Sequence, residues 1–235
     1  MTKALYLEDS YMKEFEATVI KVIDKNYIIL DQTAFYPGAG GQPEDHGTLG
    51  SKEGVFKVVF VKKTPEGISH EVDRPGLKEG AVVAGNLDWD RRYKLMRMHT
   101  ASHIISAIFN KQAGAKITGN QLGVDKSRID FNLEDFDREL INKYIDMANK
   151  ESSKGILVET FFLPRDEAMK IPNIVKLAGA LPPNVKTLRI VKIGNIDTQA
   201  DGGTHVKNTI EIGKIELLKL ENKGKNNRRA YFTIK

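Results

Sequence analysis

The hydrophobic pattern of the chain changes sharply at residues 88–92, and this change constrains the fold more than any other feature. Before it, apolar residues come in short runs, rich in β-branched and aromatic side chains and bounded by glycine, proline, asparagine or aspartate. That pattern is typical of strands separated by turns. After it, apolar residues recur at intervals of three and four, as on one face of a helix. We therefore predict an α+β chain of two domains, residues 1–90 and residues 91–235.

The first domain is predicted to be a small β-barrel. Strands are expected at residues 17–23, 27–30, 55–62, 68–72 and 81–87. The segment at residues 24–26 has the composition of a hairpin turn, and the segment at residues 74–76 that of a second reversal near the end of the barrel.

The second domain is predicted to combine helices with antiparallel or mixed sheet. A long helix is expected from residue 91 to residue 113, with Gly114 as its stop. A second helix should begin at the acidic residues 132–135 and end before Gly155. Strands are expected on either side of a turn within residues 118–131, then at residues 156–162, 186–193 and 209–220, with a short helix at residues 164–169 and a final hairpin of residues 217–221 and 228–234.

Composition excludes several classes of protein. The 235 residues include no cysteine, so disulfides and thiolate metal ligands are both excluded, and any metal ion must be held by nitrogen and oxygen. No apolar run approaches the ~18 residues needed to cross a bilayer, and the first residues are acidic, so we expect a cytoplasmic protein with no membrane partner. The net charge of +5 suits a polyanionic partner, and it suits a solvated basic surface equally well.

Two histidines mark the predicted long helix. His99 and His103 are four residues apart, so both imidazoles lie on one helical face, as in the half of a zinc site that a helix supplies. The same spacing also occurs in partly buried polar patches. A third histidine, His205, ends the loop of residues 197–205, and only five histidines exist in the chain. Its presence favours a metal site.

Two further segments are candidate binding loops. Residues 35–47 are rich in glycine and proline, so their backbone can approach a ligand closely, although a plain loop between strands has the same composition. They carry neither a P-loop nor a dinucleotide-binding fingerprint. The turn at residues 222–227 is basic and continues into Arg228 and Arg229. It suits phosphate binding as well as a solvated hairpin tip.

Together these motifs resemble a known family. The pair His99-x-x-x-His103 and the loop ending in His205 resemble the editing domain of alanyl-tRNA synthetase and its free-standing relatives, the AlaX alanyl-tRNA editing proteins. Three further segments carry the resemblance: residues 40–47, residues 118–131 and residues 228–232. It covers nearly the whole chain. The order and length are similar to the medium AlaX form, a translation-factor-like barrel followed by an editing domain with a zinc-binding helix.

The resemblance implies an ester hydrolase that removes serine, with glycine as the second candidate, from alanine tRNA, tRNA(Ala). An alanine-activating site cannot reject glycine or serine strongly enough by binding alone, so a second hydrolytic site is needed. A pocket that hydrogen-bonds the serine hydroxyl spares alanine, because alanine leaves its polar groups unpaired. The resemblance implies that this pocket is lined by Gly40, Gly41, Gln42, Thr118, Gly119, Asn120 and Gln121.

The resemblance also implies a zinc site, with one departure. The family places cysteine where this chain has Asp201, so the implied ligands are His99, His103, Asp201 and His205. We expect the catalytic groups to be Asp201, His99 and His103. Three arrangements are open: a closed site of three histidines and a carboxylate, a three-histidine site with Asp201 beside it, or a site that holds no metal ion.

Two other functions are compatible with parts of the sequence. A zinc peptidase would have glutamate directly after the first helical histidine, and Thr100 stands there, which argues against peptide hydrolysis. A non-catalytic RNA-binding module with a degenerate metal site fits the basic charge equally well. Loss of the aminoacyl ester would separate an enzyme from a binding module.

Overall fold

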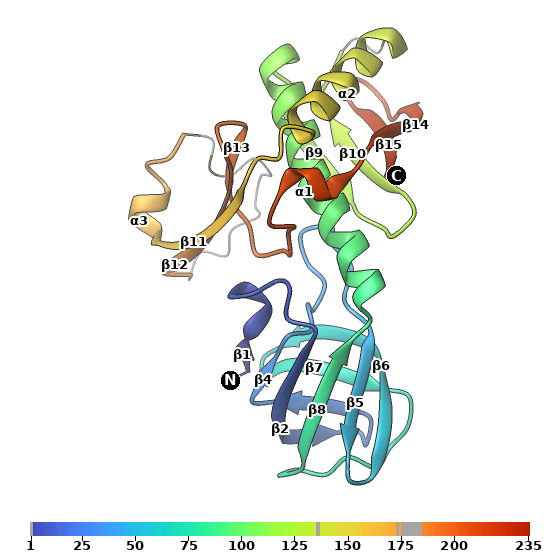
Figure 1. Cartoon of the computed structure of the whole chain (residues 1–235), viewed down its shortest axis with the longest axis vertical. Coiled ribbons are helices and arrows are strands. Elements are labelled where there is room, and N and C mark those ends of the chain that lie inside the picture. The colour runs from blue at the N-terminus through green and yellow to red at the C-terminus, as the bar shows by residue number, and fades with distance from the viewer. Residues whose placement is uncertain (1, 135–136, 173, 175–184) are drawn as a thin grey trace. The chain divides into compact units, whose positions relative to one another are not determined.

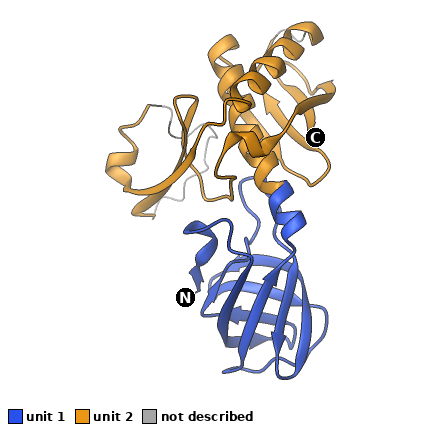
Figure 2. Cartoon of the chain, viewed as in Figure 1, with its two compact units in different colours: residues 1–94 blue, residues 95–235 orange. Residues whose placement is uncertain are grey.

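The computed structural model describes residues 2–134, 137–172, 174 and 185–235, and the chain divides into two compact units (Figure 2). The first unit comprises residues 1–94 and the second residues 95–235. None of the helices in the described part of the chain combines the length and the apolar character that a membrane span requires.

The first unit contains a closed barrel of six antiparallel strands, in the order β2-β3-β7-β6-β5-β8 (Figure 1). The strands are β2 (Glu14–Ile23), β3 (Tyr27–Leu30), β5 (Gly47–Ser51), β6 (Gly54–Thr64), β7 (Gly67–Val72) and β8 (Val82–Leu87). Alternate residues of β2 are buried, as expected when one face of a strand lines a core. The predicted small β-barrel is confirmed.

Short elements complete the first unit. Strands β1 (Lys3–Ala4) and β4 (Gln32–Thr33) form a parallel pair, and a 3-10 helix covers Leu5–Leu7. Ile23 of β2 pairs with Tyr27 of β3, and in the three-residue loop between them Asp24 and Lys25 have positive φ, 47° and 69°. The predicted turn between β2 and β3 is therefore confirmed. The sequence missed β5, because a five-residue strand with two glycines and one buried leucine carries almost no hydrophobic pattern.

Helix α1 (Trp89–Ala113) begins in the first unit, where Asp88 accepts a hydrogen bond from the backbone amide of Arg91 (3.1 Å). In its first turn, the fully buried Arg92 forms an ion pair with Asp45 and donates to the carbonyl of Ser10 (2.9 Å). Asp45 also accepts from the amide of Tyr36 (2.6 Å) and so closes the glycine-rich loop. The start of the helix and this loop are thus held by one buried ion pair.

The second unit combines two helices with two antiparallel sheets (Figure 1). Strands β14 (Ile215–Asn222), β15 (Arg228–Ile234), β10 (Ser127–Phe131) and β9 (Ile117–Gln121) form one sheet in that order, and β11 (Val158–Pro164), β12 (Thr187–Ile193) and β13 (Asp197–Ala200) form the other. Phe109 of α1 stacks on Phe131 and meets the ring of Tyr144 in α2 (Arg138–Ser152) edge-on, so both helices share a core with the larger sheet. Helix α3 (Arg165–Ala168) follows β11 directly. An α+β chain with a barrel and antiparallel sheets was predicted, and this much is confirmed.

Two predicted elements were wrong in detail. Helix α2 begins at Arg138, later than expected, because the Asp137 side chain caps it by accepting from the amide of Glu139 (2.9 Å). Residues 135–136 of the expected start lie outside the described residues. Thr209–Ile212 is a 3-10 helix and not a strand, since Asn208 and Glu211 form a capping box at its start. The polar strand β13 was missed because its four residues carry no apolar alternation.

Candidate metal centre

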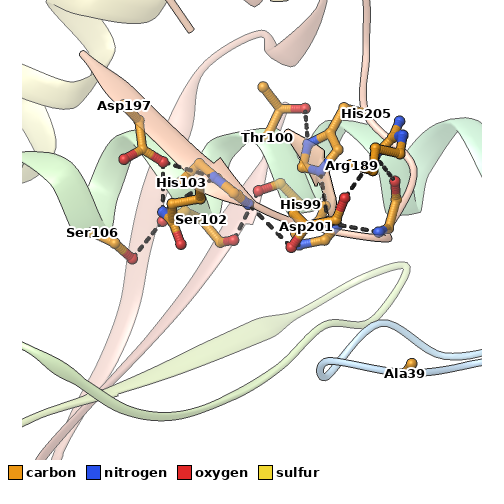
Figure 3. Close-up of polar contacts among 12 residues, drawn as sticks. Ala39, His99, Thr100, Ser102, His103, Ser106, Arg189, Asp197, Asp201 and His205 are labelled. Atoms are coloured by element: carbon orange, nitrogen blue, oxygen red, sulfur yellow. Dashed lines mark hydrogen bonds and ion pairs between the residues drawn. The ribbon is translucent and has the colours of Figure 1, made fainter. Parts of the chain in front are cut away.

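Four potential metal ligands converge in the second unit (Figure 3). Helix α1 supplies His99 and His103 from one face, as their spacing predicts. The loop after β13 supplies Asp201 and His205. One ligand atom from each of the four residues lies within 4.8 Å of the others. The structure thus brings together two segments that are about a hundred residues apart in the sequence.

The Asp201 carboxylate lies at the centre of the cluster. Its Oδ2 is 3.5 Å from Nε2 of His99 and 3.7 Å from Nε2 of His103, and its Oδ1 is 3.3 Å from Nε2 of His205. The three histidine side chains are almost fully buried, whereas the Asp201 side chain is 23% exposed. The cluster therefore meets solvent on the side of the carboxylate.

The electrostatics of the cluster favour an ionised carboxylate. Burial acts to raise the pKa of Asp201, but the charge of His99 and the hydrogen bond from His103 hold that pKa well below its usual range. Burial and the charge of His99 lower the pKa of His205, so its imidazole is neutral. Burial also acts to lower the pKa of His103, but hydrogen bonds to Asp197 and Asp201 raise it to about 9.

A second carboxylate orients His103. Asp197 Oδ2 accepts from Nδ1 of His103 at 2.8 Å, and the side-chain amide of Gln199 donates to the same oxygen at 2.6 Å (Figure 3). Because Nδ1 carries the proton, Nε2 is the nitrogen that can bind a metal ion. A carboxylate behind a histidine is the usual outer layer of a metal site, where it fixes the ring and raises its basicity.

Thr100 orients His205, as Asp197 orients His103. The Thr100 hydroxyl donates to the carbonyl of Met96 (3.0 Å) and lies 3.3 Å from Nδ1 of His205. Since its single hydrogen is used on Met96, the oxygen accepts from Nδ1–H, and Nε2 of His205 faces the cluster. The residue that stands in place of a peptidase glutamate therefore holds a ligand in position.

Arg189 fixes the loop that carries the other two ligands. Its guanidinium donates to the carbonyls of Asp201 (3.0 Å) and Gly203 (2.9 Å), and its own carbonyl accepts from the amide of Asp201 (3.0 Å). Asp201 Oδ1 accepts from the amide of Gly203 at 2.6 Å. The carboxylate is thus held from two sides before any ligand binds.

The arrangement fits a small divalent cation. Imidazole nitrogen and carboxylate oxygen are donors that zinc accepts, and tetrahedral coordination at ~2.0–2.1 Å requires donors about 3.4 Å apart. The three distances from the carboxylate, 3.3 to 3.7 Å, are close to that separation. The residues could hold a metal ion after small side-chain shifts.

The other predicted site residues fall in two places. Gly40, Gly41 and Gln42 belong to the first unit, where the two glycines have φ of 58° and 88° and Gln42 is 2% exposed. Residues 118–121 belong to β9, at the edge of the larger sheet in the second unit, and the Thr118 hydroxyl donates to the side chain of Asn227 (3.3 Å). That these residues line a substrate pocket stays a prediction.

Sequence reasoning missed the residues behind the ligands. A weak signal exists for Arg189, a charged residue in a mostly apolar strand. Asp197, which begins β13, has no comparable signal. Arg228 and Arg229, considered as phosphate ligands, both make internal contacts. Arg228 donates to the carbonyl of Gly224 (2.7 Å), and Arg229 pairs with Asp130.

Comparison with known proteins gives matches across both units. The family model described as "tRNA synthetases class II (A)" matches residues 3–91, and that described as "Threonyl and Alanyl tRNA synthetase second additional domain" matches residues 188–231. The second match includes Asp201 and His205.

Individual relatives extend the match to the full chain. The alanyl-tRNA editing protein AlaX-M of Methanosarcina barkeri is 50% identical over 241 residues, which cover 100% of this chain and 99% of that protein. AlaX-M of Saccharolobus solfataricus is 51% identical over 240 residues and is covered completely. The alanine–tRNA ligase of Thermococcus kodakarensis is 41% identical over 225 residues, which cover 94% of this chain and 24% of the ligase. The chain therefore corresponds to a whole AlaX-M protein and to one segment of a ligase.

Proposed function

The chain belongs to the AlaX-M family of alanyl-tRNA editing proteins, and on that basis we propose that it hydrolyses the ester joining a wrongly attached serine to alanine tRNA. Editing proteins of this family are hydrolases that act on aminoacyl-tRNA, so tRNA is the partner. Glycine is the second candidate for the amino acid removed. The observation that carries the proposal is the convergence of His99, His103, Asp201 and His205 in a chain that matches AlaX-M proteins from end to end.

We assign these four residues to a zinc ion. A carboxylate replaces the cysteine that the family usually supplies, and its central position supports the closed arrangement of three histidines and Asp201. Zinc would supply a positive charge that polarises an ester carbonyl or a water molecule. Asp197 and Thr100 would keep the Nε2 atoms of His103 and His205 directed at the ion.

The side chains of the protein need to contribute only part of the rate acceleration. An aminoacyl ester is already labile, so holding it in place and stabilising developing charge is sufficient for a large acceleration. Asp201 is anionic and faces solvent, and Arg189 and the amide of Gly203 hold it in position. In this proposal, residues 118–121 of the second unit contact the amino acid and contribute to the selectivity for serine over alanine.

The decisive experiment is a deacylation assay with purified protein. Seryl-tRNA(Ala) and correctly charged alanyl-tRNA(Ala) are incubated with the protein as purified, after treatment with a chelator, and after zinc is restored. We expect loss of serine that is much faster than loss of alanine, that stops with the chelator and that returns with zinc. Binding of tRNA without any loss of serine would contradict the proposal and identify a non-catalytic RNA-binding module.

A further inference from the structure

The outer face of the four-stranded sheet carries a hollow of about 410 Å³ that the proposed catalytic machinery uses only at Gln121. Residues from β9, β10, β15 and the turn after β9 line it: Gln121, Gly123, Lys126, Arg128, Arg229 and Tyr231. Its volume lies in the range of sites for small organic ligands, ~300–1,000 Å³. A single nucleotide is of that size.

The strand pattern separates this hollow from the core. Ile129 and Phe131 of β10, and Ala230 and Phe232 of β15, are buried, and Phe131 stacks on Phe109 of α1. Because side chains alternate along a strand, Arg128, Arg229 and Tyr231 point to the opposite face. The register confirms this, since Arg128 pairs with Tyr231 and Asp130 with Arg229.

Positive charge dominates the hollow. Asp130 accepts two hydrogen bonds from Arg229 (2.7 and 2.9 Å) and one from Arg128 (2.8 Å), so two guanidinium groups share one carboxylate. Lys126 is exposed and adds a third cation. These four groups carry a net charge of two positive, and the shared carboxylate keeps the guanidinium planes in fixed positions. The hollow is therefore prepared for an anion.

Tyr231 adds an aromatic surface to the charged hollow. Its hydroxyl donates to Glu221 at 3.3 Å, which fixes the orientation of the ring. Lys126 Nζ lies 5.3 Å from the ring centroid. An exposed cation–π contact is worth only ~0.5–1 kcal/mol. Stacking of a nucleic-acid base on an aromatic side chain is worth ~1–3 kcal/mol, so a base would displace the ammonium group from the ring.

We propose that this hollow binds one unstacked nucleotide of the tRNA, with its base against Tyr231 and its phosphate beside Lys126, Arg128 and Arg229. The inference rests on the proposed function only for tRNA as the source of the nucleotide. An unpaired nucleotide is required because a base in a helix does not expose its face, whereas single-stranded segments present theirs to aromatic side chains.

The experiment measures the Kd of uncharged alanine tRNA by fluorescence anisotropy at several salt concentrations. Tyr231→Leu removes the aromatic face and should weaken binding about 5- to 150-fold, from the energy of one stacked base. Tyr231→Phe keeps the ring and should bind like the wild type. Lys126→Gln should reduce the slope of log Kd against log salt by about one, as expected for one phosphate contact.

A matched control separates this hollow from general basic charge. Lys192→Gln makes the same change on the smaller sheet, where Lys192 pairs with Glu159 at 3.7 Å, and should leave both Kd and slope unchanged. Equal binding by Tyr231→Leu and Tyr231→Phe, with an unchanged slope for Lys126→Gln, would overturn the proposal. Lys126 is exposed, so its variant tests the site even if a Tyr231 variant does not fold.

Deacylation distinguishes this proposal from the proposed function. Rates are measured over a range of seryl-tRNA(Ala) concentrations. The Tyr231→Leu and Lys126→Gln variants should reach the wild-type kcat at saturation and show a raised KM. Wild-type protein that binds tRNA in a Tyr231-dependent way without deacylating it would overturn the editing function and support the nucleotide site. If the wild-type protein deacylates seryl-tRNA(Ala) and the variants bind tRNA with the wild-type Kd, the editing function is supported and the nucleotide site is overturned.

Discussion

Asp201 stands where the family resemblance implies a cysteine, and its environment makes it a proposed zinc ligand. Both carboxylate oxygens face histidine nitrogens, and Arg189 and Gly203 hold the residue from the other side. A metal ligand differs from a nearby general base in one respect. Removing the ligand lowers the metal affinity as well as the rate of ester hydrolysis. The two roles can therefore be separated by measuring zinc and activity on the same variants.

Asp201→Ala should lose stoichiometric zinc and most deacylase activity, whereas Asp201→Cys, which restores the usual family ligand, should keep both. Removing a ligand should cost more than the ~10- to 100-fold loss of metal affinity seen for outer-layer partners. Zinc content after dialysis and the single-turnover rate measure the two effects. An Asp201→Ala protein that retains one zinc per chain would rule out the four-ligand arrangement and leave Asp201 beside a three-histidine site.

His103 should make the metal-free protein sensitive to pH. Burial acts to lower its pKa in the folded protein, but hydrogen bonds to Asp197 and Asp201 outweigh that effect and raise the pKa to about 9, against an ordinary value of 6.5. A raised pKa contributes stability that is complete below pH ~6.5 and is lost as pH rises through ~9. The loss should be on the order of 3–4 kcal/mol, at about 1.4 kcal/mol per unit of pKa.

Urea unfolding of chelator-treated protein at pH 6, 7.5 and 9.5 measures this loss. Asp197→Asn removes the first partner of His103 and should flatten the dependence on pH while lowering stability at pH 6. A wild-type free energy of unfolding that stays level from pH 6 to pH 9.5 would show that folding does not raise the pKa of His103. Zinc binding requires the same proton to leave Nε2, so zinc affinity should rise over the same interval.

At the scale of elements, long and strongly patterned segments could be predicted from the sequence. The helix that carries His99 and His103 was predicted to within two residues of α1 because its apolar spacing extends over about four turns, from residue 95 to residue 109. Strand β13 was missed, and with it the position of Asp197 behind His103, because neither feature has a local signal. Thr100 could not be assigned to His205 since that contact joins residues 105 positions apart. The metal ligands could be predicted from sequence motifs, but the residues that orient them are set by tertiary contacts that the sequence does not show.

The start of α1 depends on the buried pair of Arg92 and Asp45. Removing one partner of such a pair leaves an uncompensated buried charge, at a cost of ~3–5 kcal/mol. Asp45→Ala should therefore lower the free energy of unfolding by about that amount, because Arg92 keeps only backbone carbonyl partners. Chemical denaturation checks the change. Glu14→Ala, an exposed site on β2, should stay within ~0.5 kcal/mol, and an equally small change for Asp45→Ala would contradict this account.

At the scale of the whole molecule, zinc should stabilise one unit and leave the other unchanged. The four proposed ligands all lie in the second unit, and a core of residues between Leu5 and Leu87 belongs entirely to the first. A ligand that binds only the native state stabilises by an amount set by its concentration relative to Kd, about 2.7 kcal/mol at a hundredfold excess. Two units with separate cores can unfold in separate steps.

The single tryptophan makes this difference measurable. Trp89 lies in the first unit, where it stacks on Tyr93 with ring centroids 5.6 Å apart, so its fluorescence follows unfolding of that unit. Helical circular dichroism follows mainly the second unit, which holds α2 and most of α1. We expect zinc to raise the Tm from circular dichroism and leave the Tm from fluorescence unchanged. In the His99→Ala/His103→Ala protein, zinc should change neither Tm. If zinc raises both values equally, the two units unfold as one cooperative structure, and the metal site then stabilises the barrel as well as the loop that it closes.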